Sequence, residues 1–150
     1  MFLFESLLVA MSTYSVIPVP QFEWNDRNMK YAICFFPAVG IFCGTALWGW
    51  SALADSLGIG GFFFAMIATC LPLLITGGIH MDGYMDTVDA LASHQSRERK
   101  LEILKDPTCG AFAVIYCGVY LLVYAGLMHE LYTENCVLVL CPTFVLSRSL

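Results

Sequence analysis

Residues 31–54 read YAICFFPAVGIFCGTALWGWSALA, which is 24 residues without a charged side chain. An α-helix that crosses a bilayer needs about 20 predominantly apolar residues. The 20 residues 60–79 and the 22 residues 107–128, apolar from 108 onwards, are likewise free of charge. The sequence therefore predicts three transmembrane helices, over 31–54, 60–79 and 108–128.

Two further apolar segments lie at the ends of the chain. Residues 6–17 carry several hydroxyl side chains and are followed by Pro18 and Pro20. This segment either spans the membrane or lies in its interface as an amphipathic helix. The last segment, 136–150, is still apolar at Val145, and the sequence stops at Leu150 after Ser147-Arg148-Ser149. We interpret residues 1–150 as a single integral membrane domain that is truncated within its last span.

The composition excludes several classes of protein. Hydrophobic residues make up 59% of the chain and charged residues 13%, with a mean hydropathy of +0.73. Soluble domains average about 45–50% apolar and about 25% charged residues. The net charge of −5 also argues against a nucleic-acid partner. We therefore predict an all-α, polytopic membrane helical bundle, with the lipid bilayer as its surroundings.

Six of the seven basic residues lie on alternate connections between the apolar runs. Residues 19–30 carry Arg27 and Lys30, whereas the turns 55–59 and 130–135 carry no Lys or Arg. The connection 80–106 carries four basic residues: Arg97, Arg99, Lys100 and Lys105. Because Lys- and Arg-rich loops stay in the cytoplasm, this pattern predicts a multi-pass protein of the cell (inner) membrane whose residues 80–106 face the cytoplasm.

An acidic pattern begins at the end of the apolar run 60–79, where residues 76–91 read TGGIHMDGYMDTVDAL. On a helix, Asp86 lies about 40° from Asp82, and Asp89 lies about 20° to the other side. Three neighbouring carboxylates repel one another unless a cation sits among them. Oxygen ligands beside a phosphate-bearing substrate favour Mg²⁺. We therefore interpret Asp82, Asp86 and Asp89, which we call the acidic stripe, as a metal site. The alternative interpretation is a solvated polar face of the helix.

Other polar residues are candidates for the same site. His80 lies about 160° from the aspartates on a helical projection, so it is either catalytic or a capping residue. Asp106 is a candidate fourth metal ligand. Arg97 and Lys105 either meet substrate phosphates or form a solvated basic face. Arg148 lies in an apolar run and needs an anionic partner, either the acidic site or a substrate phosphate.

A pair of glycines marks a helix-contact face. Gly40 and Gly44 form a GxxxG pattern inside the first predicted span. Small residues at this spacing let two membrane helices approach closely. The pattern therefore predicts a neighbouring helix against this face.

The motifs together resemble a known family. The run GGIHMDGYMDTVD at 77–89, followed by RERKLEILKD at 97–106 and by Gly110, resembles cobalamin synthase, the membrane adenosylcobinamide-GDP ribazoletransferase family. PVP at 18–20, FPAVG at 36–40 and Ser147-Arg148 match further segments of that family. The resemblance covers essentially the whole chain.

The resemblance implies an enzyme of the last stage of cobalamin synthesis. It joins adenosylcobinamide-GDP to α-ribazole or its 5′-phosphate, releases GMP and needs Mg²⁺. Metal on the aspartates would bridge the diphosphate, and one aspartate or His80 would accept the hydroxyl proton. Two positions depart from the family pattern, because many members have Glu where this chain has Met81 and Gly where it has Ala90.

Two other functions stay open on the sequence alone. A Mg²⁺-dependent membrane phosphatidyl- or prenyltransferase also places spaced aspartates at a diphosphate site. A non-enzymatic cation channel or transporter would need its carboxylates at mid-membrane depth, whereas these follow the span. The oligomeric state stays open as well, a homo-oligomer included.

Overall fold

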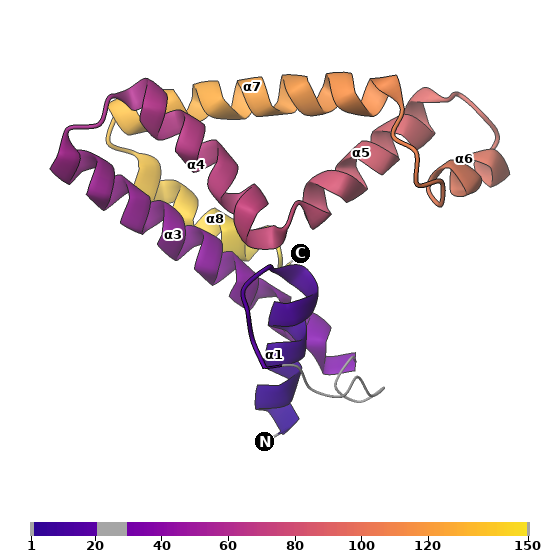
Figure 1. The fold of residues 1–150 in the computed structure, drawn as a ribbon, viewed down its shortest axis with the longest axis horizontal. Coiled ribbons are helices and arrows are strands. Elements are labelled where there is room, and N and C mark those ends of the chain that lie inside the picture. Colours follow the sequence, from indigo (N-terminus) through magenta and orange to yellow (C-terminus); the bar gives the residue numbers. More distant parts are fainter. Residues whose placement is uncertain (1, 21–29, 150) are drawn as a thin grey trace.

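The computed structural model describes residues 2–20 and 30–149, and every regular element in these ranges is helical. The all-α class and the apolar helices predicted from the sequence are confirmed. Arg27 lies outside the described ranges. The elements, drawn in Figure 1, are α1 (Phe2–Tyr14), η1 (Ile33–Phe35), α3 (Phe36–Leu57), α4 (Gly61–Thr76), α5 (Ile79–Ala92), α6 (Arg97–Ile103), α7 (Ala111–Thr133), η2 (Val137–Leu140) and α8 (Cys141–Leu146).

In the part of the chain that the structure describes, two helical stretches are long and apolar enough to cross a membrane by themselves, Lys30–Leu57 and α7. The helix α4 has 16 residues, and at 1.5 Å per residue its length of about 24 Å falls short of a hydrocarbon core of about 30 Å. It passes the same test only together with α5, and the two helices are bent by 93° at their junction. The apolar run 60–79 is therefore one helix that ends at Thr76 and turns.

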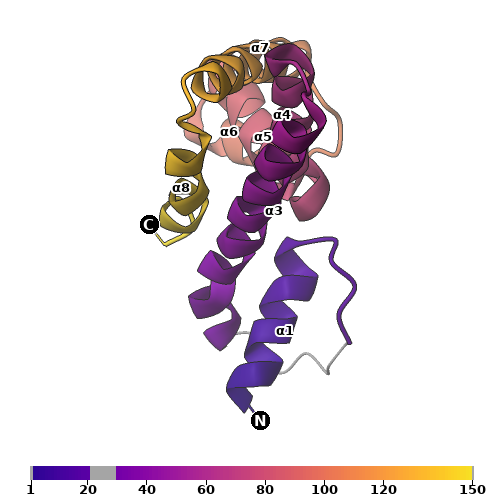
Figure 2. The same cartoon turned by 90° about the vertical axis from the view of Figure 1, so that its left-hand side faces the viewer.

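The helix α8 lies directly against the glycine face of α3, and Figure 2 shows the two running side by side. A Cβ added to Gly40 would come 2.3 Å from the carbonyl oxygen of Phe144, and one added to Gly44 would come 2.6 Å from that of Cys141. Only residues without a side chain permit this backbone approach. The helix-contact face predicted from the GxxxG pattern is confirmed.

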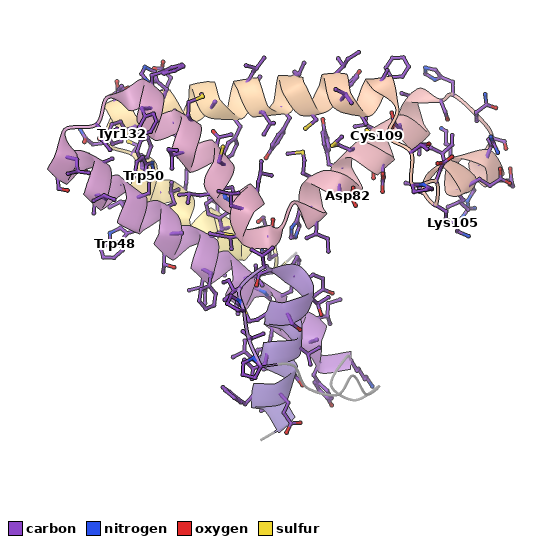
Figure 3. All side chains as sticks on the ribbon, in the orientation of Figure 1. Trp48, Trp50, Asp82, Lys105, Cys109 and Tyr132 are labelled. Carbon is purple, nitrogen blue, oxygen red and sulfur yellow. The ribbon has the colours of Figure 1, made fainter. Side chains whose placement is uncertain are left out.

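Aromatic rings fill the core between α3, α4 and α7. The fully buried Phe64 stacks on Tyr132 with ring centroids 4.0 Å apart, and its ring also lies parallel to that of Trp50. The indole N–H of Trp50 donates to the Phe64 carbonyl at 3.1 Å, so the indole nitrogen of this half-buried residue has a partner. Figure 3 shows Trp50 and Tyr132 together at this end of the bundle. This core fixes α4 and α7 relative to each other.

Candidate active site

The acidic helix α5 is positioned by a turn at two glycines. Gly77 and Gly78 have φ values of 62° and 78°, and glycine adopts this left-handed backbone without strain. Both amides donate to the Leu73 carbonyl, at 3.0 Å for Gly78, which closes α4. The chain then restarts as α5. Figure 1 shows α4 and α5 as the two arms of a V whose open ends lie against the two ends of α7.

The segment that follows α1 packs against the turn at Gly77 and Gly78. The Val16 N–H donates to the carbonyl of Ile75 at 2.9 Å, in the last turn of α4. A Cβ on Gly77 would come 2.8 Å from Cγ1 of Val16. The residues just before the PVP motif at 18–20 therefore pack on the junction from which α5 begins.

The first two aspartates of the stripe keep their oxygens free. Asp82 is exposed and Asp86 is half-buried, and Figure 3 shows Asp82 on the side of α5 that faces away from α7. Within residues 2–20 and 30–149, neither carboxylate accepts a hydrogen bond or pairs with a cation. Side chains four residues apart on a helix are neighbours. This pair can therefore take an added ligand without losing an existing contact.

The third aspartate is engaged with another helix. Both carboxylate oxygens of Asp89 accept backbone hydrogen bonds at the start of α7, from Gly110 N–H at 2.5 Å and from Ala113 N–H at 2.9 Å. Asp89 therefore joins the end of α5 to the beginning of α7. The helical pattern alone could not show this contact, because the partners lie more than 20 residues further along the chain.

Asp106 is also engaged, but locally. Its Oδ1 accepts hydrogen bonds from the hydroxyl of Thr108 at 2.6 Å and from the Thr108 N–H at 2.9 Å. These two bonds lower the pKa of Asp106 below its usual value, because they favour the ionised carboxylate. Among the described residues, no three His, Cys, Asp or Glu side chains gather closely enough to hold a metal ion.

His80 lies on the opposite face of α5 from the aspartates. Because α5 begins at Ile79, His80 belongs to the helix and keeps the angular separation of its helical position. Its ring stacks on Phe36 of α3 with centroids 5.3 Å apart and planes within 7°. Tyr84, one turn further along the same face, lies 5.7 Å from the ring of Tyr120 on α7. The i, i+4 spacing of His80 and Tyr84 was the signal in the sequence for this second face.

His80, Tyr84 and Tyr120 line a cavity of about 490 Å³ between α4, α5, α7 and α8. Arg148 also lines it and is half-buried. One Arg148 Nη donates to the Phe144 carbonyl at 2.9 Å, while the buried Nε has no partner among the described residues. In the described part of the chain no carboxylate pairs with Arg148, since Arg99–Glu102 is the one salt bridge there. The cavity therefore presents an unpaired cation.

The basic segment forms α6 after the acidic helix. Ser96 begins it as an N-cap that accepts from the Arg99 N–H. Arg97 and Lys105 are both exposed. Figure 3 shows Lys105 beside α6, beyond the far end of α5 from Asp82. The structure thus places the basic segment near Asp89, at the end of α5. Arg148 lies near the beginning of α5 instead, in the cavity that His80 lines.

Comparisons with known proteins agree on one family. The model of the cobalamin-5-phosphate synthase family matches residues 6–150. A Lachnoclostridium phytofermentans protein named adenosylcobinamide-GDP ribazoletransferase is 48% identical over 146 residues, covering 97% of this chain and 56% of its own length. Proteins of the same name are 40% identical in Clostridium perfringens, over 83% of this chain and 50% of theirs, and 37% identical in Brevibacillus brevis, over 85% and 51%.

The chain spans about half the length of the curated relatives that it matches. No solved structure matches it. The family model nevertheless runs through nearly every described helix, including the acidic helix α5 and the arginine of the cavity. The chain therefore belongs to the cobalamin-5-phosphate synthase family.

Proposed function

We propose that the protein containing this chain transfers the adenosylcobinamide phosphate moiety of adenosylcobinamide-GDP to α-ribazole or its 5′-phosphate and releases GMP. The observation that carries this proposal is the acidic helix α5, set at the end of an apolar helix in a chain whose relatives bear that enzyme's name. The same names weigh against a phosphatidyl- or prenyltransferase and against a cation transporter. We also propose an inner-membrane location with α5 facing the cytoplasm.

The carboxylates of α5 suit Mg²⁺. This ion is usually held by one or two carboxylates together with substrate phosphates. Asp82 and Asp86 supply two neighbouring carboxylates with free oxygens, and we propose them as its ligands. When bound there, Mg²⁺ would neutralise charge that develops on the diphosphate during transfer.

The residues of the chain would share the remaining tasks. The ribazole hydroxyl attacks the phosphorus next to adenosylcobinamide, the bond to the GMP oxygen breaks, and GMP leaves with the electron pair of that bond. We assign the hydroxyl proton to a carboxylate of the stripe, since the His80 ring lies on the other face of α5 against Phe36. Arg148 would hold an anionic group of a substrate that enters the cavity.

The direct test uses the full-length protein. Incubation with adenosylcobinamide-GDP, α-ribazole and Mg²⁺ should release GMP and form a cobalamin in equal amounts. A parallel incubation with α-ribazole 5′-phosphate compares the two acceptors. Absence of GMP release with both acceptors, from protein that is folded and supplied with Mg²⁺, would contradict the proposed function.

Substitution of the candidate phosphate-binding residues Arg97, Lys105 and Arg148 should lower substrate affinity to different extents. A charge-assisted phosphate contact contributes about 1.5–3 kcal/mol when desolvated, roughly ten- to hundredfold in affinity. Arg148→Met should approach this range, because Arg148 is half-buried. Arg97→Ala and Lys105→Ala should raise KM by less, and their effect should fade with salt, because both side chains are exposed. Steady-state kinetics at two salt concentrations measure this. Loss of kcat without change in KM would move these residues into the catalytic centre.

The predicted topology can be read from two native thiols at opposite ends of α7. Cys109 precedes α7 and Cys136 follows it, and both are exposed. In variants that keep one of these two cysteines, an impermeant maleimide should label Cys109 only in inside-out vesicles. It should label Cys136 in intact spheroplasts. The opposite pattern would place the acidic helix outside the cytoplasm.

A further inference from the structure

Asp89 shares a helix face with Asp82 and Asp86, but its surroundings differ from theirs. We infer that Asp89 is a positioning residue, which caps the N-terminus of α7 and holds α5 against it, and that it is not a third ligand of the metal. The inference rests on the proposed function for its activity measurements. Its structural measurements are independent of that function.

The start of α7 needs a cap that its own sequence does not provide. Its N-cap residue is Gly110, which has no side chain, and the helix has no side-chain cap of its own. The first amides of a helix have no partner within that helix. In a helix that enters an apolar phase, unpaired amides are especially costly. Asp89 supplies the missing acceptors from α5, since its two oxygens bind the N–H groups of Gly110 and Ala113.

The negative charge of Asp89 adds to these two bonds. The N-terminus of a helix carries a partial positive charge, so a carboxylate is favoured there. Hydrogen bonds from backbone amides to an ionised carboxylate are also stronger than those to a neutral acceptor. A metal ion at the same carboxylate would compete with the helix terminus for the same oxygens.

Gly110 leaves room for the Asp89 carboxylate because it has no side chain. A Cβ on Gly110 would lie 2.6 Å from Oδ1 and 2.7 Å from Oδ2 of Asp89. Any side chain at position 110 would therefore push the carboxylate away. The Asp89 carboxylate fits against Gly110 because that residue has no side chain. We call this contact between Asp89 and Gly110 the α5–α7 joint. It closes the connection of residues 93–109, which carries the basic segment.

The joint gives Asp89 an indirect role in the reaction. Asp86 lies one turn before Asp89 on α5, and the basic segment lies between Asp89 and Gly110 in the chain. Loss of the joint would let α5, and Asp86 with it, move relative to α7 and to the basic segment. A displacement of about 1 Å in a positioned group can lower a rate by about a hundredfold. We therefore expect Asp89→Asn to lower kcat about that much while leaving the half-maximal Mg²⁺ concentration unchanged.

A disulfide in place of the carboxylate tests this role directly. A Cβ at position 110 would lie 2.8 Å from Cγ of Asp89. The Cβ atoms at 89 and 110 are thus no more than about 4.3 Å apart, which does not exceed the 3.5–4.5 Å that a disulfide spans. We expect the double variant Asp89→Cys, Gly110→Cys, made in a Cys109→Ser background, to cross-link on oxidation. The cross-link is read by mass spectrometry, without any assay of activity.

The oxidised double variant should regain at least about tenfold in kcat over its reduced form. Reduction with dithiothreitol should abolish that gain. If the cross-link forms and the rate stays as low as in the reduced protein, the carboxylate itself is required and the inference is wrong. If no cross-link forms in folded protein, the α5–α7 joint does not exist in solution. A wild-type protein that releases no GMP would instead contradict the proposed function and leave the cross-linking result standing.

A second variant keeps Asp89 and disturbs only its partner. Gly110→Ala should lower kcat as Asp89→Asn does, because the new Cβ displaces the carboxylate. Gly118→Ala is the matched control, since a Cβ at that position of α7 meets nothing within 4 Å. Hydrogen exchange of the first α7 amides should become faster in Gly110→Ala and stay unchanged in Gly118→Ala. Unchanged exchange and rate in Gly110→Ala would contradict the inference.

Discussion

Replacement of Asp82 or Asp86 by Asn should remove nearly all turnover while the protein still folds and inserts. Each substitution takes away one negative oxygen ligand from a pair that has no other described partner. The loss of transition-state stabilisation should be about 4 kcal/mol, which is on the order of a thousandfold in rate. Because the lost interaction strengthens as charge develops during transfer, the decrease should appear in kcat even at saturating substrate.

The measurement is GMP release by full-length variants at saturating Mg²⁺. Glu134→Gln is a suitable control, because Glu134 is an exposed carboxylate just beyond the other end of α7. It changes the net charge equally and should leave kcat unchanged. If Asp82→Asn and Asp86→Asn both kept rates within tenfold of wild type, the stripe would be a solvated helix face.

Gly40→Leu should detach α8 from α3 and destabilise the domain. Even a Cβ at position 40 would overlap backbone atoms of Phe144 and Val145, which cannot rotate away as a side chain can. Overpacking of well-packed interiors costs about 1–3 kcal/mol, and this backbone overlap belongs at the upper end. The cavity should be affected too, because α8 carries Phe144 and is followed by Arg148.

Thermal unfolding of the detergent-solubilised protein would show this loss. Gly49→Ala, on the same helix, is the matched control, because a Cβ there meets nothing within 4 Å. Alanine is also the better helix former, by about 0.5–1 kcal/mol. Gly49→Ala should therefore leave the unfolding temperature unchanged or raise it. Equal unfolding temperatures for the two variants would mean that α8 does not pack on this face.

Helix content and the main spans could be predicted from the sequence because both depend on local pattern. The absence of charge over 31–54 and 108–128 identified α3 and α7, and the GxxxG spacing identified the face that α8 covers. The turn after Thr76 could not be predicted, since hydropathy does not register backbone conformation. The left-handed φ values of Gly77 and Gly78 and the 93° bend are set by packing.

For the candidate site, too, the sequence predicted the local pattern but not the contacts between helices. A helical projection placed the aspartates on one face and His80 on the other, and the structure retains both placements. The projection treated the three aspartates as equivalent, because it contains only angles within one helix. The contact of Asp89 with Gly110, and the half-buried, unpaired state of Arg148, depend on elements distant in the chain. Such differences emerge only when the helices are assembled.

The bend between α4 and α5 also decides the height at which the carboxylates lie. In a helix that continued straight on from α4, Asp89 would stand about 10 Å beyond Asp82 along the axis. With α5 turned by 93°, almost none of that separation lies along the α4 axis. Asp82 and Asp86 therefore lie at nearly the same position along the direction of the α4 axis, and together they form a level surface, or shelf. A diphosphate lying flat on this shelf would meet both carboxylates without one phosphate having to sink deeper than the other.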